Sequence, residues 1–229
     1  MFPNVVEDPS LRDKTFVFKD RLLGAKLLAQ KLSAYAHDTD SITLAIPAGG
    51  IPVGYVMSTT LAIALDLIVV RKVQVPWDPE VGFGAVAWKG EMILDRHMIA
   101  QLGLSETEVD KAVSKASANV RERVEKFRKD RPLPDLRGKK VLIVDDGLAT
   151  GFTMLAAVRT VKKEKPDETI VAVPTASMSA IELLAKEADL LVALNIRTEP
   201  FFAVADAYKN WSDVSEAEAV KFLERAWHS

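Results

Sequence analysis

The stretch VLIVDDGLATGFT, residues 141–153, joins four apolar residues to two adjacent aspartates and then to a segment rich in Gly, Ala and Thr. An uninterrupted apolar run is typical of a strand buried on both faces of a parallel sheet. The residues that follow predict a turn into a helix. Because open α/β sheets bind ligands at the carboxyl ends of their strands, residues 145–153 lie where a ligand is expected.

Similar apolar runs alternate with segments of helical spacing along the chain. The predicted strands are 42–47, 67–71, 140–144, 169–174 and 190–194, and the predicted helices are 20–36, 52–65, 151–163 and 177–186. This alternation predicts an α/β fold with a doubly wound, mainly parallel sheet flanked by helices. We expect the whole chain, 1–229, to form a single domain.

The composition limits the classes of function. Thirty basic and 32 acidic side chains give a net charge of -2, so no general positive field attracts nucleic acid or an anionic membrane. The absence of cysteine excludes disulfides and thiolate nucleophiles. Residues 1–10 lack a secretion-signal pattern, and polar residues interrupt the apolar stretch 51–70. We expect a cytoplasmic protein that binds neither nucleic acid nor membranes.

Capping boxes predict the starts of two more helices. Ser105 precedes Glu108 by three residues, and Ser215 precedes Glu218 by the same spacing. The first box opens a long charged helix at about 105–130. Its basic end, RERVEKFRKDR, also contains acidic residues, so a solvated helix face is favoured over a nucleic-acid site.

The turn after the 141–144 strand has the features of an anion site. Gly147 and Gly151 permit close approach of a ligand to the backbone, and the first amides of the following helix lack internal partners. Thr150 and Thr153 add hydroxyl donors. Together with the helix dipole, these groups suit a phosphate monoester. The segment has no GK[ST] and no GxGxxG, so it is neither a Walker loop nor a dinucleotide fingerprint.

The two adjacent aspartates must contact a part of the ligand other than its phosphate. Asp145 and Asp146 would repel a bare phosphate, but carboxylates accept hydrogen bonds from hydroxyls and bind Mg²⁺, usually through water. A sugar phosphate satisfies both halves of the motif. The alternative is a helix-capping aspartate beside an ordinary Asp-Gly turn.

VLIVDDGLATGFT resembles the phosphoribosyl-pyrophosphate (PRPP) signature of type I phosphoribosyltransferases. The resemblance implies that Asp145 and Asp146 hold the ribose hydroxyls and, through water, a Mg²⁺ cofactor. It assigns the 5′-phosphate to Gly147, Ala149, Thr150, Gly151, Phe152 and Thr153. It also implies a small hood and a flexible flap beside the sheet.

The segment IPAGGIPVG, 46–54, occupies the place of the family's pyrophosphate loop. The resemblance assigns pyrophosphate to Ala48, Gly49 and Gly50, with a strained, often cis, peptide between Ala48 and Gly49. Taken alone, a Gly-Gly pair is more often a simple tight turn. Members of the family often carry Arg or Lys where this chain has Ala48. The backbone amides of the loop must therefore contribute more of the binding of pyrophosphate.

A basic pair and a glycine-containing segment follow the 67–71 run. Arg71 and Lys72 are either solvated or, by the resemblance, catalytic residues beside pyrophosphate. The flap is expected at about 73–92, where Gly82, Gly84 and Gly90 permit movement.

The family's hood corresponds to about 195–229 together with the N-terminal segment. Aromatic residues there are often core, but by the resemblance Phe201 is the candidate to stack on the acceptor, with Tyr208 in support. FKDRLLGAKLLAQKL, 18–32, adds to a resemblance to a subgroup whose acceptors are undefined.

The predicted activity is transfer of the 5-phosphoribosyl group from PRPP to a small-molecule nucleophile, with release of pyrophosphate. Branches that act on 6-oxopurines carry an aspartate at the position of Ala149, so hypoxanthine and guanine are disfavoured. The alternatives are a PRPP-binding regulator without catalysis and a sugar-phosphate hydrolase or isomerase. Related enzymes are commonly dimers, so the resemblance also implies a homodimer.

Overall fold

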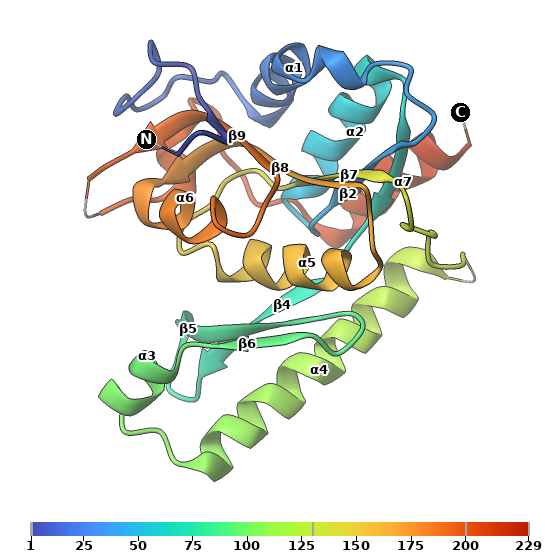
Figure 1. Cartoon of the computed structure of the whole chain (residues 1–229). Helices are drawn as coiled ribbons and strands as arrows, with labels where there is room; N and C mark the ends of the chain where they lie inside the picture. Colours follow the sequence, from blue (N-terminus) through green and yellow to red (C-terminus); the bar gives the residue numbers. More distant parts are fainter. Residues whose placement is uncertain (1, 130, 200, 229) are drawn as a thin grey trace.

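The centre of the structure is a six-stranded parallel sheet (Figure 1). The computed structural model describes residues 2–129, 131–199 and 201–228, with the side chains of all of these except 79 and 80. The strands are β1 (Val5–Val6), β2 (Ser41–Ala45), β3 (Ala64–Leu67), β7 (Lys140–Val144), β8 (Glu168–Ser177) and β9 (Leu190–Arg197). Their order is β1-β9-β8-β7-β2-β3, and every neighbouring pair is parallel.

Helices cover both faces of this sheet (Figure 1). One face carries α1 (Arg21–Lys31), α2 (Gly50–Leu61) and α7 (Glu216–Trp227), and the other carries α5 (Phe152–Lys163) and α6 (Met178–Leu184). Short 3-10 turns lie at Ser33–Tyr35 and Val204–Ala207. The predicted doubly wound α/β fold is therefore confirmed.

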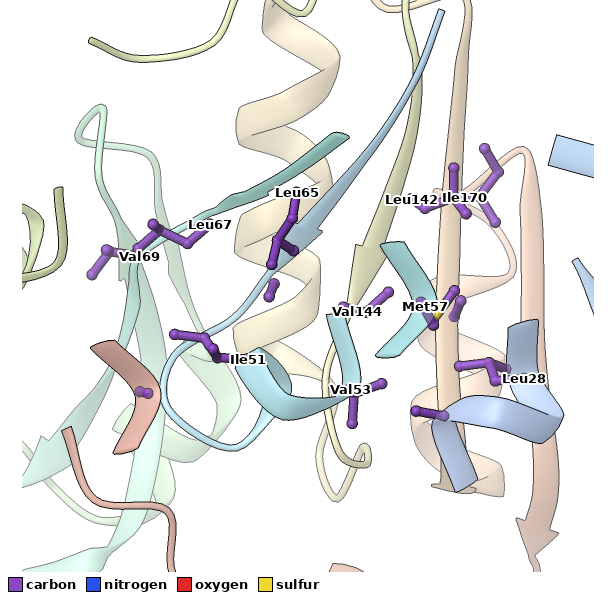
Figure 2. Packing of buried hydrophobic residues seen from close by; sticks show 14 of the residues in the cluster. Leu28, Ile51, Val53, Met57, Leu65, Leu67, Val69, Leu142, Val144 and Ile170 are labelled. Atoms are coloured by element: carbon purple, nitrogen blue, oxygen red, sulfur yellow. The ribbon is translucent and has the colours of Figure 1, made fainter. Parts of the chain in front are cut away.

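The side chains of β7 alternate between two hydrophobic clusters. Leu142 and Val144 pack on the α1 and α2 side, whereas Val141 and Ile143 pack on the α5 side. Figure 2 shows the first cluster, in which Met57 of α2 lies near Val144. Because helices cover both faces of the sheet, every residue of β7 after Lys140 is buried. Both faces of the strand are therefore apolar, and its sequence does not alternate between polar and apolar residues.

Both predicted capping boxes are present. The Ser105 hydroxyl accepts from the amide of Glu108 at the start of α4 (Glu106–Arg128), and Ser215 does the same for Glu218 at α7. Residue 130, the predicted end of the long helix, lies outside the described residues. Within the described chain, no helix has the length and apolar character needed to cross a membrane.

A second, antiparallel sheet interrupts the alternation. It consists of β4 (Val70–Val75), β5 (Asp78–Ala87) and β6 (Met92–Leu94), followed by α3 (Arg96–Gln101) and α4. It lies beyond α5 from the central sheet, with α4 alongside (Figure 1). The predicted flap at 73–92 is thus a regular three-stranded structure, and its closure over a ligand stays a prediction.

The predicted strand at 67–71 is wrong as a single element of the parallel sheet. Leu67 ends β3, and the chain then starts β4 in the antiparallel sheet at Val70. The predicted helix 52–65 also extends too far, because α2 ends at Leu61 and Ala62 is left-handed, with φ 53°. Asp66 is the one polar residue in 61–70, so the local sequence gives little to mark these boundaries, and the packing of neighbouring elements sets them.

A buried ion pair joins the end of α4 to β3. The Arg128 guanidinium contacts both carboxylate oxygens of Asp66, with Nη2 3.2 Å from Oδ2, and each residue is less than 5% exposed. Arg128 also lies over the Trp88 ring, 5.3 Å from its centroid. The pair therefore anchors the long helix to the edge of the central sheet.

We expect Asp66→Ala to lower the free energy of unfolding by about 3–5 kcal/mol, because it leaves the Arg128 charge buried without its partner. Urea unfolding followed by circular dichroism measures the change. Asp40→Ala removes an exposed ion pair with Lys139 and is expected to lower it by less than about 1 kcal/mol. Equal losses in the two variants would contradict this account.

Candidate functional site

The acidic pair lies at the carboxyl end of β7, beside a cavity of about 490 Å³. Gly151 has φ 80°, a left-handed conformation that favours glycine, and immediately precedes α5. No side chain of the described residues caps this helix, so its first amides are available to a ligand. The cavity is lined by residues 145–154, Lys72, Gly82, Gly84 and Val204.

The two glycine-containing loops meet at the acidic pair. β2 and β7 are neighbours, with Ala45 opposite Val144, so the turns that follow them emerge side by side. A β-carbon on Gly49 would lie 2.1 Å from Oδ2 of Asp146, and one on Gly50 would lie 2.7 Å from the Val144 carbonyl oxygen. The absence of side chains at both glycines therefore permits the contact between the loops.

The cis peptide implied between Ala48 and Gly49 lies one bond earlier, between Pro47 and Ala48. Gly49 already has helical dihedral angles, φ -61° and ψ -34°, and leads directly into α2. The change of chain direction is therefore complete before Gly49. Ala48 and Gly49 are half-buried, and Gly50 is buried.

The Asp146 carboxylate is paired with an arginine from the start of α1. Nε of Arg21 donates to Oδ2 of Asp146 at 2.8 Å, and the aspartate side chain is 14% exposed. The hydroxyl of Tyr208 donates to the main-chain carbonyl of the same aspartate at 2.5 Å. Asp145 accepts from the Asp146 amide at 2.8 Å and has no ion pair within the described residues.

Arg21 also connects this aspartate to the C-terminal segment. Its Nη1 donates to the Ser212 carbonyl at 2.7 Å, and the guanidinium lies 3.7 Å from the centroid of the Trp211 ring. Arg21 was not among the site residues predicted from the sequence. The only local signal was a basic residue in the first turn of a predicted helix, where the helix dipole disfavours a cation.

Burial governs the electrostatics of the acidic pair. It raises the pKa of Asp145 well above the usual value, and the negative charge of Asp146 raises it further. Burial also raises the pKa of Asp146, but the Arg21 guanidinium opposes this shift. Arg21 therefore favours ionisation of Asp146 over ionisation of Asp145.

The structure separates Arg71 from Lys72. Consecutive strand residues point to opposite faces, and only Lys72 lines the cavity of the acidic pair. Arg71 lines a different cavity, between β4 and α4. Arg71 therefore does not line the cavity of the acidic pair, and its role beside pyrophosphate stays a prediction.

The aromatic residues also differ from the expectation. Tyr208 is 1% exposed and packs between Phe18 and Trp211, so its ring has no free face for an acceptor. Phe201 is 93% exposed and lines neither of the cavities beside the turn at 149–152. Its neighbour Phe202 lines a second cavity, of about 650 Å³, next to that turn.

Part of the N-terminal segment packs against residues 208 and 209, while the hood itself stays a prediction. Lys209 donates its amide to the Phe18 carbonyl at 2.8 Å, next to a β-bridge between Phe18 and Tyr208. The later part, α7, packs instead on α2, where the rings of Phe222 and Tyr55 lie 5.2 Å apart. Residues 200 and 229 of the predicted hood lie outside the described residues.

Residues 19–196 match the sequence profile of the phosphoribosyl transferase domain. The chain belongs to the phosphoribosyltransferase family. Two curated proteins from strains of Mycobacterium tuberculosis, each named "Putative phosphoribosyl transferase", are 34% identical over 92% of this chain. The match covers 47% of their length, so the chain spans about half of these relatives.

A solved structure has the same fold as this phosphoribosyltransferase-family chain. It is the crystal structure of the protein TT1426 from Thermus thermophilus, with a TM-score of 0.73 and 33% sequence identity. The similarity covers 91% of this chain and 98% of that one.

Asp145→Asn is expected to stabilise the protein above the pH at which Asp145 ionises. The folded-state pKa exceeds the unfolded value of about 3.8, so the folded state binds more protons and the wild type loses stability as pH rises through the folded pKa. Asparagine carries no such charge. Urea unfolding from pH 4 to pH 8 should show a gain that grows with pH. Asp135→Asn, an exposed control, should show none, and a loss at pH 8 in the Asp145 variant would contradict the interpretation.

Arg21→Gln is expected to raise the pKa of Asp146, because it removes the cation that stabilises the ionised carboxylate. A carboxyl ¹³C NMR titration measures the shift directly. Arg159→Gln loses an exposed pair with Glu187 and should leave the pKa of Asp146 unchanged. An unchanged titration in the Arg21 variant would show that the ion pair does not control this carboxylate.

Proposed function

We propose that the protein transfers the 5-phosphoribosyl group of PRPP to a small-molecule acceptor and releases pyrophosphate. The observation that carries this proposal is the common cavity of the acidic pair and the uncapped start of α5, with Gly49 against the Asp146 carboxylate. Its volume of about 490 Å³ lies within the range of small-molecule sites, about 300–1,000 Å³.

Opposite chemical preferences orient the substrate in this cavity. The carboxylates of Asp145 and Asp146 accept hydrogen bonds from the ribose hydroxyls and repel phosphate. The amides of 149–153 and the hydroxyls of Thr150 and Thr153 bind the 5′-phosphate. Pyrophosphate then extends toward residues 48–50, with Lys72 supplying positive charge from the antiparallel sheet.

The donor set fits Mg²⁺ bound together with substrate. Within the described residues no cluster of three or more His, Cys, Asp or Glu side chains forms a metal cage. Mg²⁺ commonly uses one or two carboxylates with water and substrate phosphates, which Asp145 and Asp146 allow. The bound ion would supply positive charge to the pyrophosphate leaving group.

The reaction breaks the bond between C1 of ribose and the pyrophosphate oxygen, whose electron pair leaves with pyrophosphate. A nucleophilic atom of the acceptor forms the new bond to C1. The amides of 48–50 and Lys72 stabilise the negative charge that develops on the leaving group. Asp145 and Asp146 hold the ribose while C1 becomes electron-poor.

We propose the neighbouring cavity of about 650 Å³ as the acceptor site. It shares Ala149, Thr150 and Phe152 with the PRPP cavity. Its other wall includes Ser177, whose hydroxyl donates to the Ala149 carbonyl, and Phe202, whose ring suits a planar acceptor. Phe202 therefore replaces Phe201 as the acceptor-stacking candidate.

A PRPP-binding regulator without catalysis is the second candidate, because Ala48 brings no charge to the pyrophosphate loop. Pyrophosphate release from PRPP and Mg²⁺, measured with a panel of nucleobases, separates the two functions. Turnover with any acceptor supports the transferase, whereas saturable PRPP binding without turnover supports the regulator. Turnover of ribose 5-phosphate alone would favour a hydrolase or isomerase. Cytoplasmic location and a homodimer stay predictions.

Asp146→Asn is expected to lower PRPP affinity or turnover by about 10- to 100-fold, the range for one lost hydrogen bond to a charged group. Calorimetry with PRPP and Mg²⁺ measures affinity, and the pyrophosphate assay measures turnover. Asp135→Asn makes the same chemical change at an exposed position and should leave both unchanged. Near wild-type affinity and turnover in the Asp146 variant would overturn the proposed substrate orientation.

A further inference from the structure

A basic cavity lies between the antiparallel sheet and α4, on the side of β4 that carries Arg71. Its volume is about 610 Å³, which is typical of small-molecule sites. Arg71 and Lys72 come from β4, and Lys111 and Lys115 come from successive turns of α4. Of the residues that line this cavity, the proposed transfer reaction uses only Lys72.

The charge of the lining is strongly unbalanced. Four basic side chains face a single described acidic one, Glu108. The carboxylate of Glu108 already accepts hydrogen bonds from the amide and hydroxyl of Ser105, at 2.9 Å and 2.7 Å. Its hydrogen bonds are therefore committed to the helix cap, and the charge of Lys111 acts on it without a salt bridge.

Three of the four cations form no salt bridge within the described part of the chain. Arg71, Lys111 and Lys115 form no ion pair or side-chain hydrogen bond there. Arg71 is half-buried, and burial together with the charge of Arg123 lowers its pKa, although the negative charge of Glu216 opposes this shift. Like charges four residues apart on a helix also repel each other. A bound anion would offset both effects.

The remaining lining provides polar donors and an apolar wall. Asn119 adds an amide one further turn along α4. Val75, Pro76 and Ala112 form the apolar part, which can accommodate an organic group. Enclosure between a sheet and a helix favours a small ligand over a polymer.

We propose that this cavity binds a small molecule that carries two or more phosphate groups. The phosphates bind Arg71, Lys111 and Lys115, since several cations in one cavity match a multiply charged anion better than a monovalent one. Lys72 lines both this cavity and that of the acidic pair, so the ligand lies directly across β4 from the proposed PRPP site. The proposal does not depend on phosphoribosyl transfer.

Calorimetry with inorganic tripolyphosphate and the full chain at low ionic strength tests the proposal. The wild type is expected to bind saturably. The double variant Lys111→Ala, Lys115→Ala should bind at least about tenfold more weakly, equivalent to about 1.4 kcal/mol. The charge-retaining double variant Lys111→Arg, Lys115→Arg should keep most of the affinity.

A matched control separates this cavity from general electrostatics. Arg121→Ala with Lys186→Ala removes the same charge at exposed positions outside both cavities, and binding should stay within about twofold of the wild type. Absence of saturable binding to the wild type at millimolar tripolyphosphate would overturn the proposal. Equal weakening of binding in the control variant would also overturn the proposal. Unchanged binding by the Lys111→Ala, Lys115→Ala variant would overturn it too, because the anion would then bind at the turn 149–153 instead.

Discussion

The contact between Gly49 and the Asp146 carboxylate is the constraint on which the site depends. The parallel pairing of β2 with β7 brings two turns to one edge of the sheet, but their approach is limited by the space between them. A β-carbon at Gly49 would collide with Oδ2. Glycine at this position therefore permits the close contact between the turn after β2 and the Asp146 side chain.

Arg21 makes the charge of this carboxylate depend on distant parts of the chain. It joins the first turn of α1 to Asp146 and, through Ser212 and Trp211, to the segment before α7. Tyr208 binds the carbonyl of the same aspartate. Residues near both ends of the chain therefore contact Asp146 or its partner Arg21. Their packing helps to determine whether Asp145 or Asp146 is ionised.

The antiparallel sheet contributes to two cavities of different character. Because neighbouring strand residues point in opposite directions, β4 directs Arg71 toward α4 while Lys72 reaches both cavities. On one side, carboxylates and helix amides suit a sugar phosphate. On the other side, a cluster of cations and a small apolar wall suit a multiply charged ligand. A single strand thus contributes to both binding environments.

The sequence by itself determined the doubly wound fold, the helix starts at Ser105 and Ser215, and the strand–turn–helix that carries Asp145 and Asp146. These features depend on periodicity, capping and turn chemistry, which act over a few residues. Only the tertiary structure decided that Leu67 and Val70 belong to different sheets, that Tyr208 is buried, and that Arg21 pairs with Asp146. Such outcomes arise from contacts between segments far apart in the chain, as for Arg21, and from competition between packing surfaces that local patterns do not encode.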